Sequence, residues 1–214
     1  MVKKELLIAI DGPSSSGKGT IAKKLAAHFN IPCLNTGALY RAIAFLALEN
    51  GCNLQNDEEK IIPLCQKITD LDLESPKLHN EQIGKAASIV AAKPKIRQAI
   101  FDLQRDFAQD GLAENSGAIL EGRDIGTVIL PNANHKFFIT ASADIRAKRR
   151  FNQLQQNGFE DVNYQEILQQ IQKRDEQDKN RLTAPLKKAV DAMEIDTSDM
   201  DVDEVIAKIL EVCI

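Results

Sequence analysis

A glycine-rich segment near the N-terminus holds the residues best suited to chemistry. It reads Gly-Pro-Ser-Ser-Ser-Gly-Lys-Gly-Thr and lies between an apolar run and a helix-like pattern. Glycines let the backbone approach a polyphosphate closely, so several N–H groups can converge on it, and the lysine adds positive charge toward the terminal phosphates. We predict a triphosphate-binding loop formed by Gly12, Pro13, Ser14, Ser15, Ser16, Gly17, Lys18, Gly19 and Thr20.

The loop departs from the usual pattern, in which Ser or Thr directly follows the lysine. Here Gly19 intervenes, and the hydroxyl belongs to Thr20, which we expect to help hold hydrated Mg²⁺ beside the phosphates. The order G-K-G-T resembles the nucleoside monophosphate kinases more than GTPases or motor ATPases. A guanine-reading [NT]-K-x-D sequence is absent.

Four further segments could neutralise a second phosphate, as a kinase with a nucleotide acceptor requires. Two combine a helix with an arginine, one follows a predicted strand directly, and one places Arg, Asp and Arg at i, i+4 and i+7 on one helix face. The candidate residues are Thr36 and Arg41, Ser88 and Arg97, Arg123 and Asp124, and Arg174, Asp178 and Arg181.

Each segment also has an ordinary structural interpretation. Thr36 could be an N-cap beside a solvated arginine, residues 121–126 an ordinary charged turn, and Ser88 a small residue at a helix contact. The arginines near residues 174–181 could form a surface salt-bridge ladder. The phosphate loop shifts our interpretation of this last segment toward binding.

The composition excludes several classes of protein. The chain has 214 residues, of which 43% are hydrophobic and 27% charged, as in soluble globular domains. Its net charge is −4, and the basic residues form no extended block, which favours free nucleotides over nucleic acid. Four scattered cysteines predict reduced thiols. Because no run of 18 apolar residues occurs, we expect a cytoplasmic protein that does not span a membrane.

The hydrophobic pattern predicts strands that alternate with helices. Strands are expected at 6–10, 118–121, 136–140 and 194–196. Helices are expected from Thr36 as N-cap to Gly51, from Asp57, at 81–92 and 96–107, from Ser142 to near Gly158, at 164–181, and around 205–212. This pattern predicts an α/β fold with a central parallel sheet flanked by helices, in which ligands gather at the carboxyl ends of the strands.

The chain resembles the bacterial cytidylate kinases over most of its length. Five motifs carry the resemblance, in the order G-P-S-S-S-G-K-G-T, N-T-G-A-L-Y-R, A-A-S-x-V-A-A-x-P-x-I-R, E-G-R-D-I-G-T-V and R-D-E-Q-D-K-N-R. The resemblance implies one P-loop kinase domain over 1–214, an acceptor-binding region at 37–110 and a mobile helical lid at 143–181. It also implies ATP as phosphoryl donor, CMP and dCMP as acceptors, and Mg²⁺.

The resemblance also implies roles for the candidate residues. Residues 12–20 would hold the ATP phosphates, and Arg41, Arg123 and Arg181 the acceptor phosphate. Ser88, Arg97 and Asp124 would meet the edge of cytosine, and Arg174 with Asp178 would contact the ribose. The catalytic set would be Lys18, Arg123, Arg174 and Arg181, which surround the transferring phosphoryl group.

Two features differ from the usual family pattern. Members usually carry a longer strand-rich insert with an Ile-Arg-Ser/Thr sequence, whereas this chain has a shortened insert at 71–82, with His79 at the place of that arginine. Glu121 replaces a frequent Asp, which bears on how the magnesium water shell is held. These differences leave the preference among CMP, dCMP and UMP open. We expect a monomer.

Two other interpretations follow from the same residues. One is a P-loop kinase for another small molecule, such as AMP, UMP or shikimate. The other is a nucleotide-controlled switch that turns over slowly. Arginines at four separate segments favour phosphoryl transfer over switching.

Overall fold

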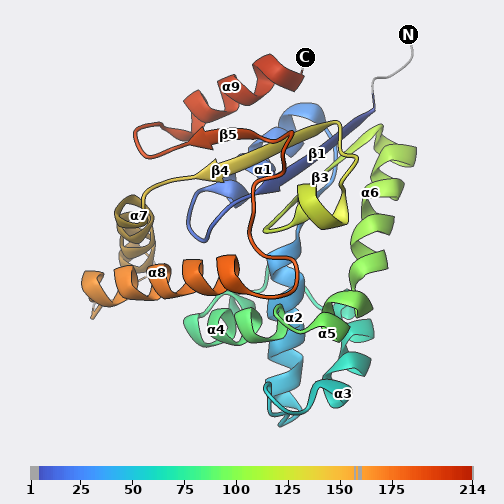
Figure 1. Ribbon diagram of the computed structural model, residues 1–214, viewed down its shortest axis with the longest axis vertical. Coiled ribbons are helices and arrows are strands. Elements are labelled where there is room, and N and C mark those ends of the chain that lie inside the picture. Colours follow the sequence, from blue (N-terminus) through green and yellow to red (C-terminus); the bar gives the residue numbers. More distant parts are fainter. Residues whose placement is uncertain (1–4, 157, 159–160, 214) are drawn as a thin grey trace.

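The apolar run near the N-terminus forms the central strand of a parallel sheet. In the computed structural model, which describes residues 5–156, 158 and 161–213, β1 spans Leu6–Asp11. It pairs with β3 (Gly117–Gly122) on one side and with β4 (His135–Thr140) on the other. β2 (Cys33–Asn35) and β5 (Met193–Asp196) complete the order β2-β3-β1-β4-β5 (Figure 1). The four predicted strands and the parallel sheet are confirmed.

Helices connect the strands, as the alternating pattern predicts. The α-helices are α1 (Lys18–Phe29), α2 (Thr36–Glu49), α3 (Glu58–Ile61), α4 (Glu81–Val90), α5 (Pro94–Ala99), α6 (Phe101–Asn115), α7 (Ala143–Gln156), α8 (Tyr164–Asn180) and α9 (Val202–Cys213). Two 3₁₀ helices are η1 (Ile62–Asp70) and η2 (Pro76–Leu78), and η3 (Ile125–Ile129) is a π-helical turn. Among the described residues, every helix is too short or too polar to cross a lipid bilayer.

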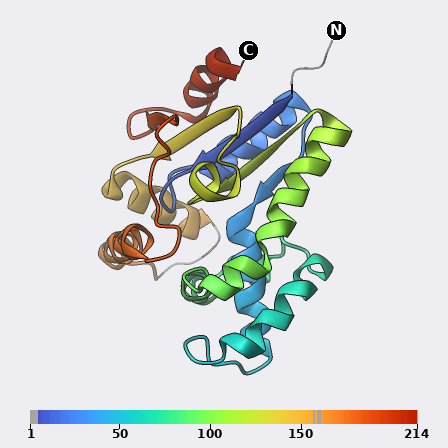
Figure 2. The ribbon, with the colours of Figure 1, turned by 45° about the vertical axis from the view of Figure 1, so that its right-hand side comes forward.

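Helices cover both faces of the sheet, because its strands are apolar on both sides. Ile8 and Ile10 of β1 belong to one buried cluster with residues of α1 and α9, whereas Ala9 belongs to the opposite cluster, with residues of α2 and α6. This alternation follows from the two-residue period of a strand. Figures 1 and 2 show the resulting layers, with α1 and α9 on one side and α2 and α6 on the other.

The helices α7 and α8 pack on each other beside the carboxyl ends of the strands. Their contact has its own small core of Ala147, Ile167 and Ile171, which is separate from the two clusters around the sheet. In Figure 1, α8 runs below the sheet. Residues 157 and 159–160, within the segment expected as a lid, lie outside the described residues.

Two of the predicted helices differ from the structure. The helix predicted at 96–107 is divided at Ile100 into α5 and α6, and α6 continues to Asn115. The start of α2 also differs. Asn35, and not Thr36, is the N-cap of α2, and its side-chain oxygen accepts a hydrogen bond from the N–H of Ala38 at 3.2 Å. The Thr36 hydroxyl donates instead to the carbonyl of Glu121 at 2.9 Å, because β2 lies beside β3. The prediction of Thr36 as N-cap is therefore wrong by one residue. Ser142 does cap α7, where its hydroxyl accepts from the N–H of Ile145.

Candidate active site

The glycine-rich segment forms a tight loop between β1 and α1. At Gly12 the backbone has φ +149°, and a Cβ there would lie 2.0 Å from the carbonyl oxygen of Ile139 in β4. Any residue with a side chain would clash at this position, so glycine is required. Gly17, with φ +92°, ends the loop and Lys18 begins the helix. The N-terminal N–H groups of α1 therefore face the loop, as an anion site requires.

Lys18 is the buried cation of this loop. Its side chain is only 5% exposed in the folded chain, and its ammonium group donates to the carbonyl of Pro13 at 2.7 Å. Burial, followed by repulsion from Arg123, lowers the pKa of Lys18 to about 7. A bound polyphosphate would supply the missing negative charge and favour the ammonium form.

The unusual glycine after the lysine has a steric cause. A Cβ on Gly19 would lie 3.0 Å from a carboxylate oxygen of Glu121, which is tighter than ordinary contact. Glu121 is buried near the end of β3, the strand next to β1. The G-K-G-T order and the glutamate therefore fit each other: the side chain that the usual loop carries after its lysine would occupy space that Glu121 already fills.

Two hollows meet at the phosphate loop. The smaller, of about 480 Å³, is lined by Thr20 of α1, Arg149 of α7 and residues that follow β5, including Met200 and Asp201. The larger, of about 1100 Å³, extends between α4 and α8. Ser15, Arg150 and Gln153 line both hollows, so the two meet beside the loop.

The larger cavity has a positively charged lining. Its basic residues outnumber its acidic ones: the former are Arg41, Lys85, Lys93, Arg150, Lys173, Arg174 and Arg181, and the latter Glu58, Glu81 and Asp178. Arg174 is partly exposed, but its Nε is buried and has no hydrogen-bond partner among the described residues. Burial, with repulsion from Arg123, lowers the pKa of Arg174 to about 10. Such a lining suits an anionic ligand.

Two buried aspartates hold the arginines beside this cavity. Asp178 accepts from Nε of Arg123 at 2.8 Å. Burial acts to raise the pKa of Asp178, but the charges of Arg123 and Arg174 keep it below its ordinary value. Asp124 accepts from Arg97 through one oxygen and, more loosely at 3.4 Å, from Arg181 through the other. The loop after β3 is thereby joined to α8 and to the segment that follows it.

Arg41 and Ser88 reach the cavity from α2 and α4. The guanidinium of Arg41 donates to the carbonyl of Leu78 at 2.9 Å and packs against Gly84, where a Cβ would lie 3.3 Å away. The Ser88 hydroxyl donates to the carbonyl of Gly84 within the same helix at 3.2 Å. The segment 71–82 is thus tied to Arg41 at the rim of the cavity.

The predicted acceptor-site residues divide into two groups. Arg41, Ser88, Arg174, Asp178 and Arg181 line the larger cavity directly, with Ser14 and Ser15 of the loop. Thr36, Arg97, Arg123 and Asp124 are not among the described lining residues. Two of these pair with lining residues instead, Asp124 with Arg181 and Arg123 with Asp178, and Arg97 in turn pairs with Asp124.

Comparison with known proteins identifies the family. The model of the cytidylate kinase family matches residues 8–213. A cytidylate kinase of Methylocella silvestris is 47% identical over 198 residues, which cover 92% of this chain and 89% of that protein. One of Xanthobacter autotrophicus is 45% identical over 207 residues, 97% of this chain and 96% of that protein. The chain belongs to the cytidylate kinase family. It is therefore a phosphotransferase, and kinase chemistry implies ATP as donor.

A solved structure supports the fold alone. An uncharacterized protein from Eubacterium ventriosum superposes with a TM-score of 0.54 at 20% identity, covering 96% of each chain. The parallel sheet with flanking helices and a phosphate loop after β1 is the arrangement predicted from the sequence.

Sequence reasoning missed several residues of this cytidylate kinase family site. Arg146 of α7, only 4% exposed, pairs with Asp175 of α8 through two hydrogen bonds of 3.0 and 2.6 Å and donates to the carbonyl of Ser14. Arg149 donates to Thr197 at 2.9 Å and 2.5 Å. Both arginines lie in a helix that the sequence predicts, but their partners lie far away in the chain, so the pattern gave no signal for them.

Proposed function

We propose that this protein transfers the γ-phosphoryl group of ATP to CMP, with ATP in the smaller hollow and CMP in the larger cavity. The observation that carries this proposal is the shared wall at Ser15, Arg150 and Gln153, beside the phosphate loop. Two nucleotides in these hollows would bring their phosphates together at that wall. The acceptor is already an ionised phosphate, so catalysis rests on positioning and charge neutralisation and requires no general base.

Four basic residues are proposed to surround the transferring group. Lys18 would contact the ATP phosphates, and Arg174 and Arg181 would reach them from the acceptor cavity. Arg123 would contact the acceptor phosphate after exchanging its bond to Asp178 for one to the phosphate. Such exchange keeps Arg123 paired, because a phosphate oxygen replaces a carboxylate oxygen as the acceptor of the arginine N–H groups.

The residues near Thr20 fit a hydrated Mg²⁺ ion. The Thr20 residue is exposed and lines the ATP-side hollow, and the Glu121 carboxylate reaches the neighbouring position of Gly19. Oxygen ligands of this kind suit Mg²⁺, with Glu121 placed to hold its water shell. The ion would neutralise charge on the ATP phosphates.

The helices α7 and α8 are proposed as a lid over both nucleotides. Their own small core makes them a unit, and Arg146 ties that unit to the carbonyl of Ser14 in the phosphate loop. Closure over both substrates would exclude water, which otherwise competes with CMP as acceptor.

Cytosine recognition is assigned to Asp124 and Arg97. Asp124 holds Arg97 firmly through one oxygen, whereas its contact from the other oxygen to Arg181 is long, at 3.4 Å. The second oxygen could accept from the cytosine amino group once Arg181 turns to the phosphates. A site that pairs a buried carboxylate with the amino group of cytosine rejects uracil. Uracil has a carbonyl in place of that amino group, and this carbonyl would face the unpaired charge of the carboxylate.

A panel of acceptors tests this function. ADP formation from ATP is measured with CMP, dCMP, UMP, AMP and shikimate, for the wild type and for the variants Asp124→Ala and Asp106→Ala. Asp106 is an exposed residue of α6 and serves as the matched control. We expect CMP to be the best substrate and its advantage over UMP to shrink only in Asp124→Ala. Another preferred acceptor would refute CMP as substrate, and an unchanged preference in Asp124→Ala would refute the role of Asp124.

A further inference from the structure

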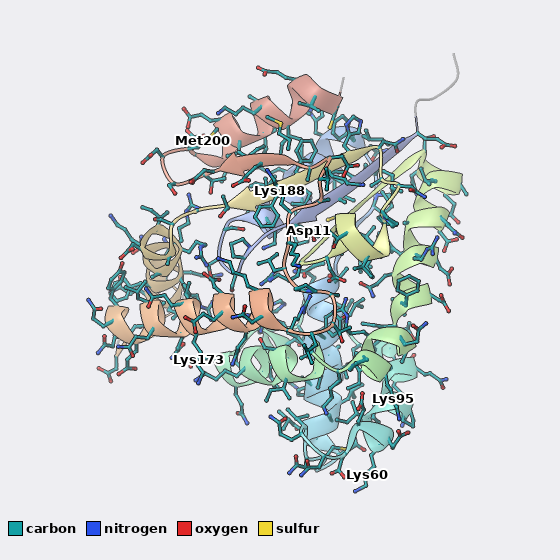
Figure 3. The ribbon with its side chains drawn as sticks, viewed as in Figure 1. Asp11, Lys60, Lys95, Lys173, Lys188 and Met200 are labelled. Atoms are coloured by element: carbon teal, nitrogen blue, oxygen red, sulfur yellow. The ribbon has the colours of Figure 1, made fainter. Side chains whose placement is uncertain are left out.

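Asp11 is a buried carboxylate that the site described above does not use. It is the last residue of β1, directly before the phosphate loop, and its side chain is 4% exposed. In the sheet it lies opposite Gly122 of β3 and Phe138 of β4, so its backbone is fixed on both sides. Figure 3 labels Asp11 near the centre of the molecule.

Both oxygens of Asp11 hold the loop that carries the acceptor residues. One oxygen accepts from the N–H of Ile125 and the other from the N–H of Gly126, each at 2.8 Å. These N–H groups begin η3, directly after Arg123 and Asp124. The segment between β3 and η3 is therefore fixed at one end by sheet pairing and at the other by Asp11.

The surroundings of Asp11 make its charge costly. Burial raises the pKa of Asp11 to about 6, although the two N–H groups favour the ionised form. The charged groups that face it are Lys18 of α1, Asp124 of the acceptor loop and, across Gly126, the Lys136 stem of β4. Lys18 donates to Pro13, and Lys136 donates to Asp191 and Pro131, so the bonds that Asp11 accepts come from the loop backbone.

We propose that Asp11 is a positioning residue for the acceptor: it sets the distance from the phosphate loop to the segment that bears Arg123 and Asp124. One residue thereby fixes the position of the acceptor site relative to the donor site. Arg123 and Asp124 contact Asp178, Arg97 and Arg181, so a shift of this short segment moves the acceptor arginines as a group. The inference rests on the proposed function, because it takes the larger cavity as the acceptor site.

The variant Asp11→Asn tests the proposal with almost no change of shape. An amide has a single acceptor oxygen, so its NH₂ group would face one of the two backbone N–H groups and push the segment away. Asp57→Asn is the matched control: Asp57 also accepts from a backbone N–H, that of Asn53 at 2.8 Å, but lies at the start of α3. For each protein, kcat, the KM for CMP, the KM for ATP and the unfolding midpoint are measured.

We expect Asp11→Asn to raise the KM for CMP about tenfold or more, while the KM for ATP changes less than about twofold. Asp57→Asn should match the wild type in both. An unchanged KM for CMP would overturn the proposal. So would an equal loss for both substrates, which indicates a structural role, or a loss confined to ATP, which indicates an effect on Lys18.

A second variant decides the question if Asp11→Asn does not fold. In Gly126→Ala the new Cβ would lie 3.2 Å from the Lys136 side chain and 3.4 Å from an Asp11 oxygen, which crowds the same contact from the other side. The same selective rise in the KM for CMP is expected, and the same contrary outcomes apply. A wild type that phosphorylates another acceptor would refute CMP as substrate only, and the comparison would then use that acceptor.

Discussion

The buried lysine of the phosphate loop predicts that ATP binding takes up a proton. In the free protein, burial and the repulsion from Arg123 hold the pKa of Lys18 at about 7. At pH 8 about nine tenths of the molecules would therefore carry a neutral lysine, about half at pH 7 and about a tenth at pH 6. A bound polyphosphate favours the ammonium form and raises this pKa well above 8. We expect uptake of about 0.9 proton at pH 8 and about 0.5 at pH 7.

Titration calorimetry measures this uptake directly. The heat of ATP binding is recorded at each pH in buffers with different ionisation enthalpies, and the slope of heat against ionisation enthalpy gives the number of protons. Lys18→Arg is the control, because a guanidinium keeps its proton throughout this range. Proton release by the nucleotide itself is common to both proteins, so the difference reports Lys18. Equal slopes at pH 8 for the two proteins would refute the neutral buried lysine.

Three further perturbations test separate parts of the site. Arg181→Ala should lower kcat about a hundredfold or more. The unfolding midpoint should change little, since the main anchor of Arg181 is one hydrogen bond to the carbonyl of Ala184. A large fall in the unfolding midpoint together with kcat would contradict a role in transfer. Gly19→Ala should raise the KM for ATP about tenfold, because its Cβ crowds Glu121. Adding Glu121→Asp, which shortens the crowded side chain, should restore the KM. If the double variant keeps the high KM, the steric explanation is wrong. Asp11 has a folded pKa of about 6 against 3.8 when unfolded, so the folded state binds more protons between these values. About 2 kcal/mol of stability is therefore lost as pH rises from 4 to 6. The free energy of unfolding of Asp11→Asn, measured in urea, should depend less on pH over this interval than that of the wild type. The same pH dependence in both proteins would contradict the raised pKa of Asp11.

The sequence predicted the elements whose signal is local. The apolar run of β1, the glycines of the loop and the start of α1 are neighbours in the chain, so their pattern carries both the fold and the phosphate site. The strand β2 (Cys33–Asn35) was not predicted because three residues show no period. Its place depends on pairing with β3, more than eighty positions away along the chain. The turn η3 was likewise missed, since its start is fixed by Asp11 from another strand.

The candidate residues were found by their type, but their partners could not be. Spacing placed Arg174, Asp178 and Arg181 along one helical stretch, which was equally consistent with a surface ladder. The structure buries Asp178 against Arg123, from the loop after β3. Arg146 shows the same limit, because its partners Ser14 and Asp175 come from two other segments. Side-chain pairing over such separations depends on the tertiary fold, which periodicity does not describe.

The arginine–aspartate pairs explain how a phosphate-binding site can fold before any phosphate is bound. Several guanidinium groups beside one cavity repel one another, and burying them unpaired would cost several kcal/mol each. Asp124 and Asp178 supply the opposite charge in the free protein, each from an element that also carries an arginine. Phosphate groups can take over that pairing one bond at a time, so each guanidinium keeps a negatively charged partner as the substrates enter. In the proposed reaction the same aspartates would then contact the nucleoside, which would couple recognition of the acceptor to assembly of the arginines around the phosphates.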